Sequence, residues 1–498
     1  MDAYEKLEAH FEDLSRFQQI MAVLHWDYAT MMPSGGAQAR GEQFAALQSL
    51  IHERLTDPRV GQWLDEVGDG RELDKWQKAN VGGMRHLWTH ASCVPTELIQ
   101  ARSRKGTECE MVWRKARKAD DFDLLAPHLQ EVLELTREVA AVKAEAFGVE
   151  PYDALLDRYD PGMTSKRVDH VFEDLAAFLP GFLEDVLERQ SKQPEPAIPQ
   201  GPFSQKDQEK LARRLMEAWT FDFEHGRLDT SHHPFCGGYP GDVRLTTHYN
   251  KDNFLRAMMA VLHETGHALY SGGLPEAWRA QPVGRARGMS VHESQSLFVE
   301  MQIGRSRPFV HWVAPLYREA FNGTDEAWSE ANLYELKTRV QRGLIRVDAD
   351  EVTYPLHVIL RYRLERALLA GEVEVDELPE VWREMMGELV GVVPETDREG
   401  CMQDIHWMDG TFGYFPTYTL GALMAAQLFD AMRSELGDVG GAVEEGEFSV
   451  IRDWLRRNVH ERGCLWTTEQ LVEEVTGSKL ETTCFKKHLR ARYLDDED

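Results

Sequence analysis

The sequence predicts a mainly α protein with a small β element. Apolar residues recur at three- and four-residue steps along most of the chain, whereas strand-like alternation is scarce. The chain of 498 residues is long enough to bury a large core. Residues 190–205 hold four prolines among polar residues, which is typical of a surface loop. Because helical patterns continue on both sides of this loop without a shift in composition, we expect one large unit.

The helical stripes follow one another along the chain. In residues 4–24 the apolar positions include Leu7, Phe11 and Leu14, which share one helical face. The same pattern predicts helices over residues 120–147, 166–189, 205–224, 252–270, 326–344, 354–369 and 419–436. The best strand pattern covers residues 242–246, where Val243 and Leu245 would face one side and the polar residues the other.

Composition and charge narrow the class of protein. The chain has 56 Lys and Arg against 84 Asp and Glu, a formal charge of −28, which argues against a nucleic-acid partner. It has no secretory signal pattern and no apolar run long enough to span a membrane. Its six cysteines are scattered, as in proteins with reduced thiols. We therefore expect a soluble cytoplasmic protein, and an acidic surface suited to high salt stays open.

The stretch His263-Glu264-Thr265-Gly266-His267 has the spacing of a metal site. Two histidines four residues apart lie on one helical face and can both bind zinc, while the glutamate can act as a general base. The alternative is a helix with two buried histidines bonded to carbonyl groups. The surrounding helix is apolar on most sides and should be buried. Buried histidine and glutamate side chains need partners, and a metal ion supplies one.

A third metal ligand should follow on another element, because a catalytic zinc takes three protein ligands and keeps one open position. Glu293, in the segment Ser290-Val-His-Glu-Ser-Gln-Ser296, fits this requirement. Glycines and prolines between the two motifs allow the chain to turn back. The alternative is a solvated charge, but the apolar neighbours Leu297 and Phe298 favour a buried ligand.

Taken together, these two motifs resemble the thermostable carboxypeptidase family (carboxypeptidase Taq family), a group of glutamate-zincins. The resemblance runs from about residue 10 to beyond residue 430. It implies a mostly helical fold around a deep substrate groove, one divalent metal per subunit (Zn²⁺ or Co²⁺) held by His263, His267 and Glu293, and a homodimer. Further family motifs occur in the expected order: Val23-Leu-His-Trp-Asp27, His233-Pro-Phe235, Asp242-Val-Arg-Leu-Thr246, Ile345-Arg-Val-Asp-Ala-Asp350 and Gly400-Cys-Met-Gln-Asp-Ile-His-Trp407.

Catalysis by such a site needs a base and donors for the developing oxyanion. Glu264 can take a proton from the water that the metal activates and pass it to the leaving amine. Candidates for the oxyanion donors are His406 and Tyr418, with Tyr414 in reserve. The choice of Tyr418 rests on resemblance to related glutamate-zincins, and the alternative is that these tyrosines belong to the core.

A carboxypeptidase must also recognise a free C-terminal carboxylate. Arg346 is our candidate, because a guanidinium binds a carboxylate through two parallel hydrogen bonds and the resemblance places its motif in the groove. The alternative is a surface pair between Arg346 and Asp350. The strand at 242–246 could pair with an extended substrate by edge addition, with Asp242 or Arg244 fixing its register. A purely structural strand is the other possibility.

Three functions are compatible with these patterns. The first is a metal-dependent carboxypeptidase that releases C-terminal residues from peptides. The second is a zinc oligopeptidase of related fold, which would not need Arg346. The third is an inactive, metal-stabilised scaffold that binds peptides, which would gain nothing from Glu264 beside the metal. We favour the first of these functions. We expect a single catalytic domain over 1–498, with a helical lid or wall at about 1–190, a metal-site core at about 206–430 and C-terminal helices at 431–498.

Overall fold

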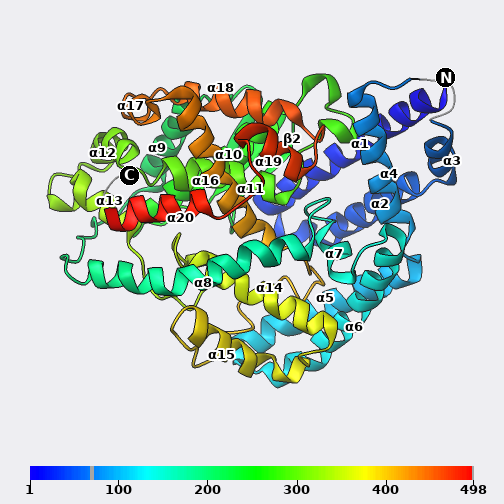
Figure 1. Ribbon diagram of the computed structural model, residues 1–498, viewed down its shortest axis with the longest axis horizontal. Coiled ribbons are helices and arrows are strands. Elements are labelled where there is room, and N and C mark those ends of the chain that lie inside the picture. Colours follow the sequence, from blue (N-terminus) through cyan, green and yellow to red (C-terminus); the bar gives the residue numbers. More distant parts are fainter. Residues whose placement is uncertain (68–71, 496–498) are drawn as a thin grey trace.

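Helices dominate the computed structural model, which describes residues 1–67 and 72–495 (Figure 1). The prediction of a mainly α fold with a small β element is confirmed. In this part of the chain the α-helices are α1 (Ala3–Thr30), α2 (Ala37–Leu55), α3 (Pro58–Glu66), α4 (Lys75–Ser92), α5 (Thr96–Ala119), α6 (Phe122–Phe147), α7 (Pro151–Leu156), α8 (Ser165–Gln190), α9 (Gln205–Ala218), α10 (Phe254–Gly273), α11 (Met289–Leu297), α12 (Arg307–Phe321), α13 (Glu330–Thr338), α14 (Tyr354–Ala370), α15 (Leu378–Leu389), α16 (Pro416–Leu436), α17 (Val439–Glu444), α18 (Phe448–Asn458), α19 (Thr468–Thr476) and α20 (Thr483–Arg490).

The first four helices lie at one end of the molecule (Figure 1). Both α1 and α4 begin with a capping box, in which an aspartate (Asp2 or Asp74) and the third helical residue bond to each other's backbone. Apolar side chains of α1, α3 and α4 form a small core of their own, which contains Leu7, Phe11, Leu14, Val60, Leu64 and Met84. Helices α5 to α8 contribute instead to the large core. The N-terminal helices therefore pack as a unit beside the rest.

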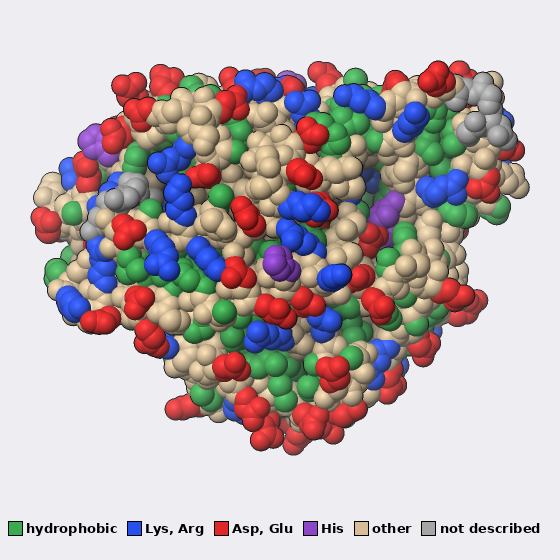
Figure 2. All heavy atoms as spheres, viewed as in Figure 1, with side chains coloured by type: hydrophobic (Ala, Val, Ile, Leu, Met, Phe, Trp, Pro, Cys, Tyr) green, Lys and Arg blue, Asp and Glu red, His purple; other side chains and the backbone are tan. Residues whose placement is uncertain are grey.

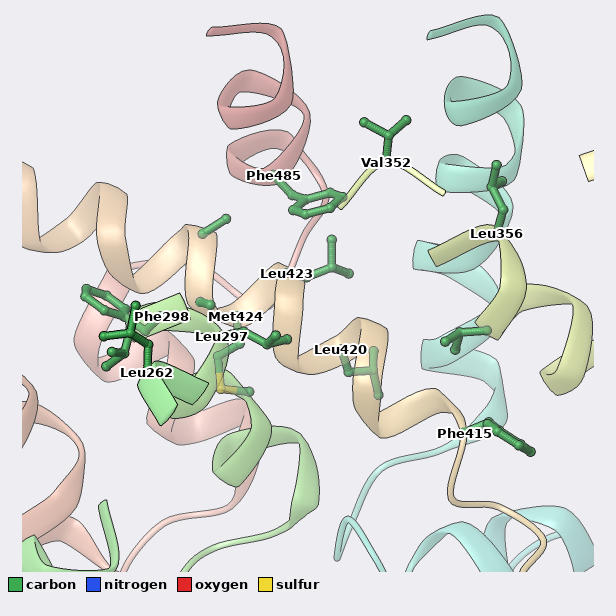
Figure 3. Close-up of a cluster of buried hydrophobic side chains, with 14 of the residues drawn as sticks. Leu262, Leu297, Phe298, Val352, Leu356, Phe415, Leu420, Leu423, Met424 and Phe485 are labelled. Atoms are coloured by element: carbon green, nitrogen blue, oxygen red, sulfur yellow. The ribbon is translucent and has the colours of Figure 1, made fainter. Parts of the chain in front are cut away.

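The large core joins helices that are far apart in the sequence. Figure 3 shows Leu262 of α10, Leu297 of α11 and Leu423 of α16 meeting in one cluster. Phe298, at the start of the single-turn π-helix η4 (Phe298–Ile303), and Phe485 of α20 complete it. These side chains are almost fully removed from water, and each such burial contributes about 1.5–3 kcal/mol to stability. The core thus holds α10, α11 and α16 against one another.

A three-stranded sheet follows α9 and leads into α10. Its strands are β1 (Gly226–Thr230), β2 (Phe235–Tyr239) and β3 (Asp242–Thr247), in the order β1-β3-β2. The predicted strand is confirmed, with Val243 and Leu245 buried on one face. β2 escaped prediction because its Cys236-Gly-Gly238 has no alternation. Gly238 has a positive φ of 89°, and a Cβ there would lie 2.0 Å from the carbonyl oxygen of Asp242.

Two predicted helices end earlier than expected. The helix predicted over 205–224 is α9, which stops at Ala218 because Thr220 adopts a positive φ of 58°. The helix predicted over 326–344 is α13, which stops at Thr338. Beyond it, the Gln190 side chain bonds to both the amide nitrogen and the carbonyl oxygen of Val340, each at 2.9 Å. A side chain thus satisfies backbone groups that a longer helix would have paired internally. The loop predicted over 190–205 is confirmed, because α8 ends and α9 begins at its two ends.

The surface is mixed in charge on the face that Figure 2 shows, where Lys and Arg side chains lie among Asp and Glu side chains. Within residues 1–67 and 72–495, no helix combines the length and the apolar character that crossing a membrane requires.

Candidate metal centre and active site

The three predicted metal ligands come together on two packed helices. His263 and His267 lie one turn apart on α10, and Glu293 lies on α11. Their ligand atoms all lie within 4.8 Å of one another, and Nε2 of His267 is 3.7 Å from Oε2 of Glu293. Two ligand atoms that share a tetrahedral zinc at its usual bond lengths are about 3.4 Å apart. The arrangement therefore fits a single divalent cation.

Hydrogen bonds orient both imidazole rings for this role. Nδ1 of His263 lies 2.9 Å from Oε2 of Glu300, and Nδ1 of His267 lies 3.0 Å from the carbonyl oxygen of His292. With Nδ1 protonated and donating, Nε2 keeps a lone pair for a metal. Glu300 lies on η4, and its other oxygen accepts a hydrogen bond from Arg305 at 3.1 Å. The π-helix η4 thus places the Glu300 carboxylate where it orients the His263 ring.

Two glycines allow the ligand helices to approach closely. A Cβ at Gly266 of α10 would lie 2.4 Å from the carbonyl oxygen of Gln295 in α11. A Cβ at Gly421 of α16 would lie 2.7 Å from Cβ of Glu293. Real Cβ atoms do not come so close to other atoms, so only glycine permits these contacts. Glu293 is therefore clamped between α10 and α16.

The electrostatics also call for a cation. Burial opposes the charge of His263, but the hydrogen bond with Glu300 and the charges of Glu293, Glu264 and Glu300 outweigh burial and raise the pKa of His263 to about 10. Burial, reinforced by Glu293 and Glu300, raises the pKa of Glu264 to about 7. Oε2 of Glu264 is buried and bonds to no described residue. Three carboxylates around two histidines form a negative site that a divalent cation would balance.

A second histidine–aspartate cluster has different geometry. His86 and His90 of α4 and Asp157, at the end of α7, also have their ligand atoms within 4.8 Å. However, Nε2 of each histidine lies 2.6–2.7 Å from the same oxygen of Asp157, which is a hydrogen-bond distance. Nζ of Lys143 is 3.0 Å from Nδ1 of His90. We assign this cluster to a hydrogen-bonded joint between α4 and α7.

One cavity of about 1020 Å³ contains most of the predicted site. Its wall includes the ligands His263 and Glu293 and the predicted base Glu264. The other predicted side chains that line it are His406, Tyr418 and Arg346. Residues that lie up to 155 positions apart in the sequence (263 and 418) therefore face one space.

Arg346 is buried and held by two partners. It lies on the single-turn 3₁₀-helix η6 (Arg346–Asp348), and its Nη2 and Nε donate to Oδ1 of Asp404 at 2.7 and 3.1 Å. Its Nη1 donates to the hydroxyl of Tyr354 at 2.9 Å. Of five guanidinium N–H donors, these three bonds leave two for a ligand. The alternative pairing with Asp350 does not occur, because Asp350 accepts backbone N–H bonds from Gln341, Val352 and Thr353.

Asp404 is shared between two arginines. Its Oδ2 accepts a hydrogen bond from Nε of Arg361 at 2.6 Å, and Arg361 is fully buried in α14. Burial raises the pKa of Asp404, but the charges of Arg361 and Arg346 outweigh burial and keep this carboxyl ionised, with a pKa well below its usual range. One carboxylate between two guanidinium groups leaves the inner end of the cavity attractive to an anion.

His406 and Tyr418 face each other at the cavity wall. The Tyr418 hydroxyl lies 3.4 Å from Nε2 of His406. Burial lowers the pKa of His406 to about 4, so its imidazole is neutral at pH 7 and carries one N–H. The ring of Tyr418 also lies 5.1 Å from the Arg346 guanidinium carbon. Tyr414 instead packs edge-on against Tyr159, at 5.0 Å between ring centres.

Edge addition of a substrate to β3 is excluded. β3 pairs with β1 on one side and β2 on the other, so neither of its edges can accept a peptide strand. The Arg244 side chain bonds to Asp242 at 2.6 and 2.8 Å and lies over the Trp26 ring of α1, 4.4 Å from its centre. Arg227 covers the same ring at 4.5 Å. The expectation that a substrate strand adds to β3 is therefore wrong. Arg244 and Arg227 instead attach α1 to the sheet through Trp26.

Sequence reasoning missed several residues of the site. Glu300 shares a helical face with Glu293, seven residues earlier, which was a detectable signal. Arg361 is a charged residue within an apolar helical run, and such a residue needs a buried partner. The pairing of Asp404 with Arg346 left no local trace, because 58 residues separate the two positions.

Comparisons with known proteins show which proteins the chain resembles. The family model for the carboxypeptidase Taq (M32) metallopeptidases matches residues 6–493. The chain is 39% identical to thermostable carboxypeptidase 1 of Thermus thermophilus, with 98% of each chain covered. Among solved structures, Trypanosoma cruzi metallocarboxypeptidase 1 superposes with a TM-score of 0.97 at 41% identity, and the M32 carboxypeptidase of Deinococcus radiodurans with 0.94 at 34%, each over 99% of both chains.

The clamp on Glu293 predicts an effect of one added methyl group. Gly421→Ala should weaken Zn²⁺ binding by about 10–100-fold, the range seen when groups supporting a metal ligand are altered, because its Cβ displaces Glu293. Competition with a chromophoric chelator measures this affinity. Gly272→Ala in α10 is the matched control, because no atom lies within 4 Å of its Cβ. Equal affinity in Gly421→Ala and the wild type would show that the clamp does not set the ligand's position.

Proposed function

This chain belongs to the carboxypeptidase Taq (M32) family of metallopeptidases and is a metal-dependent carboxypeptidase that acts on peptides, and on that premise we propose how its residues divide the work. The observation that carries the proposal is the single cavity in which the metal ligands, an unpartnered glutamate and a buried arginine converge. An endopeptidase or an idle scaffold would have no use for all three.

His263, His267 and Glu293 hold one divalent cation per subunit, Zn²⁺ or Co²⁺. Imidazole and carboxylate ligands suit either ion. When bound, the cation supplies Lewis acidity that activates water and polarises the peptide carbonyl. Glu300 and the carbonyl of His292 keep both histidines in the tautomer that leaves Nε2 available.

Glu264 acts as the general base. Its Oε2 is buried and has no other partner among the described residues, so it is available to a water molecule in the cavity. A carboxyl group whose pKa lies near 7 can take a proton from the attacking water and then deliver it to the leaving amine. His406 and Tyr418 donate hydrogen bonds to the oxyanion that develops on the carbonyl oxygen, because Nε2 and the hydroxyl face the same part of the cavity.

Arg346 binds the free C-terminal carboxylate of the peptide. Asp404 and Tyr354 fix the plane of its guanidinium, so little side-chain entropy is lost when the substrate binds. Asp242 and Arg244 support the site from outside the cavity by holding the sheet to α1. Release of one residue at a time follows, because only the last peptide bond is then in register with the metal.

The cellular context and the assembly complete the proposal. All six cysteines are free thiols, which supports a reducing compartment such as the cytoplasm. The charge of −28 disfavours nucleic acid as a partner, and we propose no membrane partner. Residues 1–498 act as one catalytic domain, with the helices up to about residue 190 as a wall, residues of about 206–430 as the metal-site core and residues 431–498 as supporting helices.

The N-terminal helical hairpin supports a homodimer. α2 has no buried residue, α1 exposes Ile20 and Tyr28, and Met31, which follows α1 directly, is also exposed. Light scattering should give a mass of two 57.1 kDa chains, because a second copy would cover these apolar side chains. Ile20→Glu with Tyr28→Glu should yield monomers, whereas Met111→Glu, at an exposed site on α5, should not. A monomeric wild-type protein at micromolar concentration would refute the dimer.

Metal binding and proton transfer can be separated by substitution. His263→Ala, His267→Ala and Glu293→Ala should each lose the metal on dialysis, whereas Glu264→Gln should keep it and lose about 10²–10⁴ in turnover. Metal content by mass spectrometry and peptide cleavage measure the two effects. Zn²⁺ or Co²⁺ should restore activity to the chelated wild type.

Each outcome of this set has a clear meaning. A variant among the three alanine substitutions that retains full metal content removes that residue from the ligand set. Wild-type turnover in Glu264→Gln would refute its role as base, and loss of metal in that variant would show a structural role instead.

The role of Arg346 predicts a dependence on the free carboxylate. Charge-assisted hydrogen bonds contribute about 1.5–3 kcal/mol, so amidation of the peptide C-terminus should slow cleavage of the last bond at least about 10-fold. Arg346→Ala should do the same to the free acid, and Arg346→Lys should restore part of the rate. The two changes combined should cost little more than either alone, because the same contact is lost once.

Controls and contrary results are available for this test. Arg256, an exposed arginine at the cavity mouth paired with Asp348, provides the matched substitution Arg256→Ala, which should keep the wild-type preference for the free acid over the amide. Equal cleavage of amidated and free peptides at internal bonds would replace carboxylate recognition with an endopeptidase mode.

A further inference from the structure

Two exposed apolar side chains stand at the mouth of the active-site cavity. Apart from Met1 at the terminus, Ile198 and Val347 are the most exposed large hydrophobic residues of the described chain, at 66% and 62%. Both line the cavity that contains Glu264 and Arg346, and none of the other strongly exposed apolar residues lines it. Single exposed apolar residues are common. Their coincidence at one opening indicates a contact surface, which we call the rim pair.

The loop that carries Ile198 is fixed in place. The Asn332 side chain accepts a hydrogen bond from the amide of Ala197 at 2.7 Å and donates one to its carbonyl oxygen at 2.8 Å. Five residues later, the amide of Phe203 bonds to the carbonyl oxygen of Lys251 at 2.8 Å, and the Phe203 ring is buried. The backbone on both sides of Ile198 is thus anchored. The exposure of its side chain is built into the loop.

Val347 is held just as firmly and lies next to Arg346 in η6. Arg346 is anchored inward by Asp404, and Asp348, on the other side of Val347, pairs with Arg256 at 3.0 Å. Consecutive Cα atoms are about 3.8 Å apart, so the backbone of Val347 lies directly beside that of Arg346, and both residues line the same cavity.

The two halves of the rim are tied together. Gln190, at the start of the proline-rich loop, bonds to both backbone groups of Val340 at 2.9 Å, and Glu195 in the loop pairs with Arg339. The segment from Arg339 leads directly to Arg346. The loop and η6 therefore form one continuous wall of the cavity mouth.

We propose that the rim pair contacts the side chain of the substrate's C-terminal residue and makes the enzyme prefer peptides that end in large aliphatic or aromatic residues. The inference rests on the proposed role of Arg346. The carboxylate and the side chain of the C-terminal residue branch from one Cα, so a carboxylate on Arg346 brings that side chain into the cavity that Ile198 and Val347 also line. Packing it between Ile198 and Val347 removes apolar surface of all three from water.

The charges at the rim do not compete with this preference. Arg256 pairs with Asp348 at 3.0 Å, and Asp252, which also lines the cavity, pairs with Lys251 at 3.0 Å, so each of these exposed charges already has a partner. A charged side chain would lose hydration against Ile198 and Val347 without gaining an ionic partner. An alanine or glycine would be too short to reach both residues of the rim pair.

The test compares peptides that differ only in the last residue: Leu, Phe, Ala, Lys or Asp. The wild type should cleave the Leu and Phe peptides with kcat/KM at least about 10-fold above the Ala peptide, the size of effect that small differences in apolar contact produce. Ile198→Ser combined with Val347→Ser should reduce this ratio to about 2-fold while kcat/KM for the Ala peptide stays within about 2-fold. Val393→Ser is the matched control, because Val393 is 57% exposed but lies outside the cavity lining.

Several results would overturn the inference. One is an unchanged Leu-to-Ala ratio in the double variant, and another is an equal loss on all five peptides. A wild-type preference for Lys or Asp would also refute it, as would a ratio that follows the penultimate residue instead of the last. Failure of carboxylate recognition is distinguishable, because amidation of the Leu peptide would then leave its cleavage unchanged in the wild type.

Discussion

The close approach of α10, α11 and α16 is the constraint on which the site depends. Two glycines, Gly266 and Gly421, bring neighbouring backbones so near to α11 that a single methyl group would not fit. This packing sets the distance from Glu293 to the histidines of α10. Since α16 also carries Tyr418, the same contact places this proposed oxyanion donor at the wall of the cavity that His263 and Glu293 line. The apolar core in Figure 3 supplies the free energy that holds the three helices at this distance.

A shared carboxylate positions the arginine that lines the cavity. Asp404 bonds to Arg346 and to Arg361, and all three groups are largely removed from water. Burying ion pairs costs desolvation energy, so this arrangement is weak evidence for stability. Its consequence is orientation. Arg361 keeps Asp404 ionised and in place, and Asp404 in turn fixes the position of the Arg346 guanidinium.

Local patterns predicted the parts of the site that are close in sequence. The ligands of α10 follow from a four-residue spacing, and Glu293 follows from the need for a third ligand with apolar neighbours. Contacts between distant segments could not be predicted in this way. Asp404, not the nearby Asp350, is the partner of Arg346, and β3 became the central strand because two unpredicted strands flank it. The predicted helix over 326–344 was cut short by Gln190, whose side chain lies 150 residues away in sequence.

The residues that line the cavity fall into a buried polar group and an exposed aliphatic group. Glu264 and Arg346, to which we assign proton transfer and carboxylate binding, are polar and buried, and these proposed roles are the same for any C-terminal residue. Such a set can accelerate cleavage but cannot distinguish one side chain from another. Discrimination therefore has to arise where the side chains of substrates differ from one another, outside the polar end. Ile198 and Val347 are exposed aliphatic residues of that cavity with anchored backbones, so under the proposed assignment selectivity can change while Glu264 and Arg346 keep their positions.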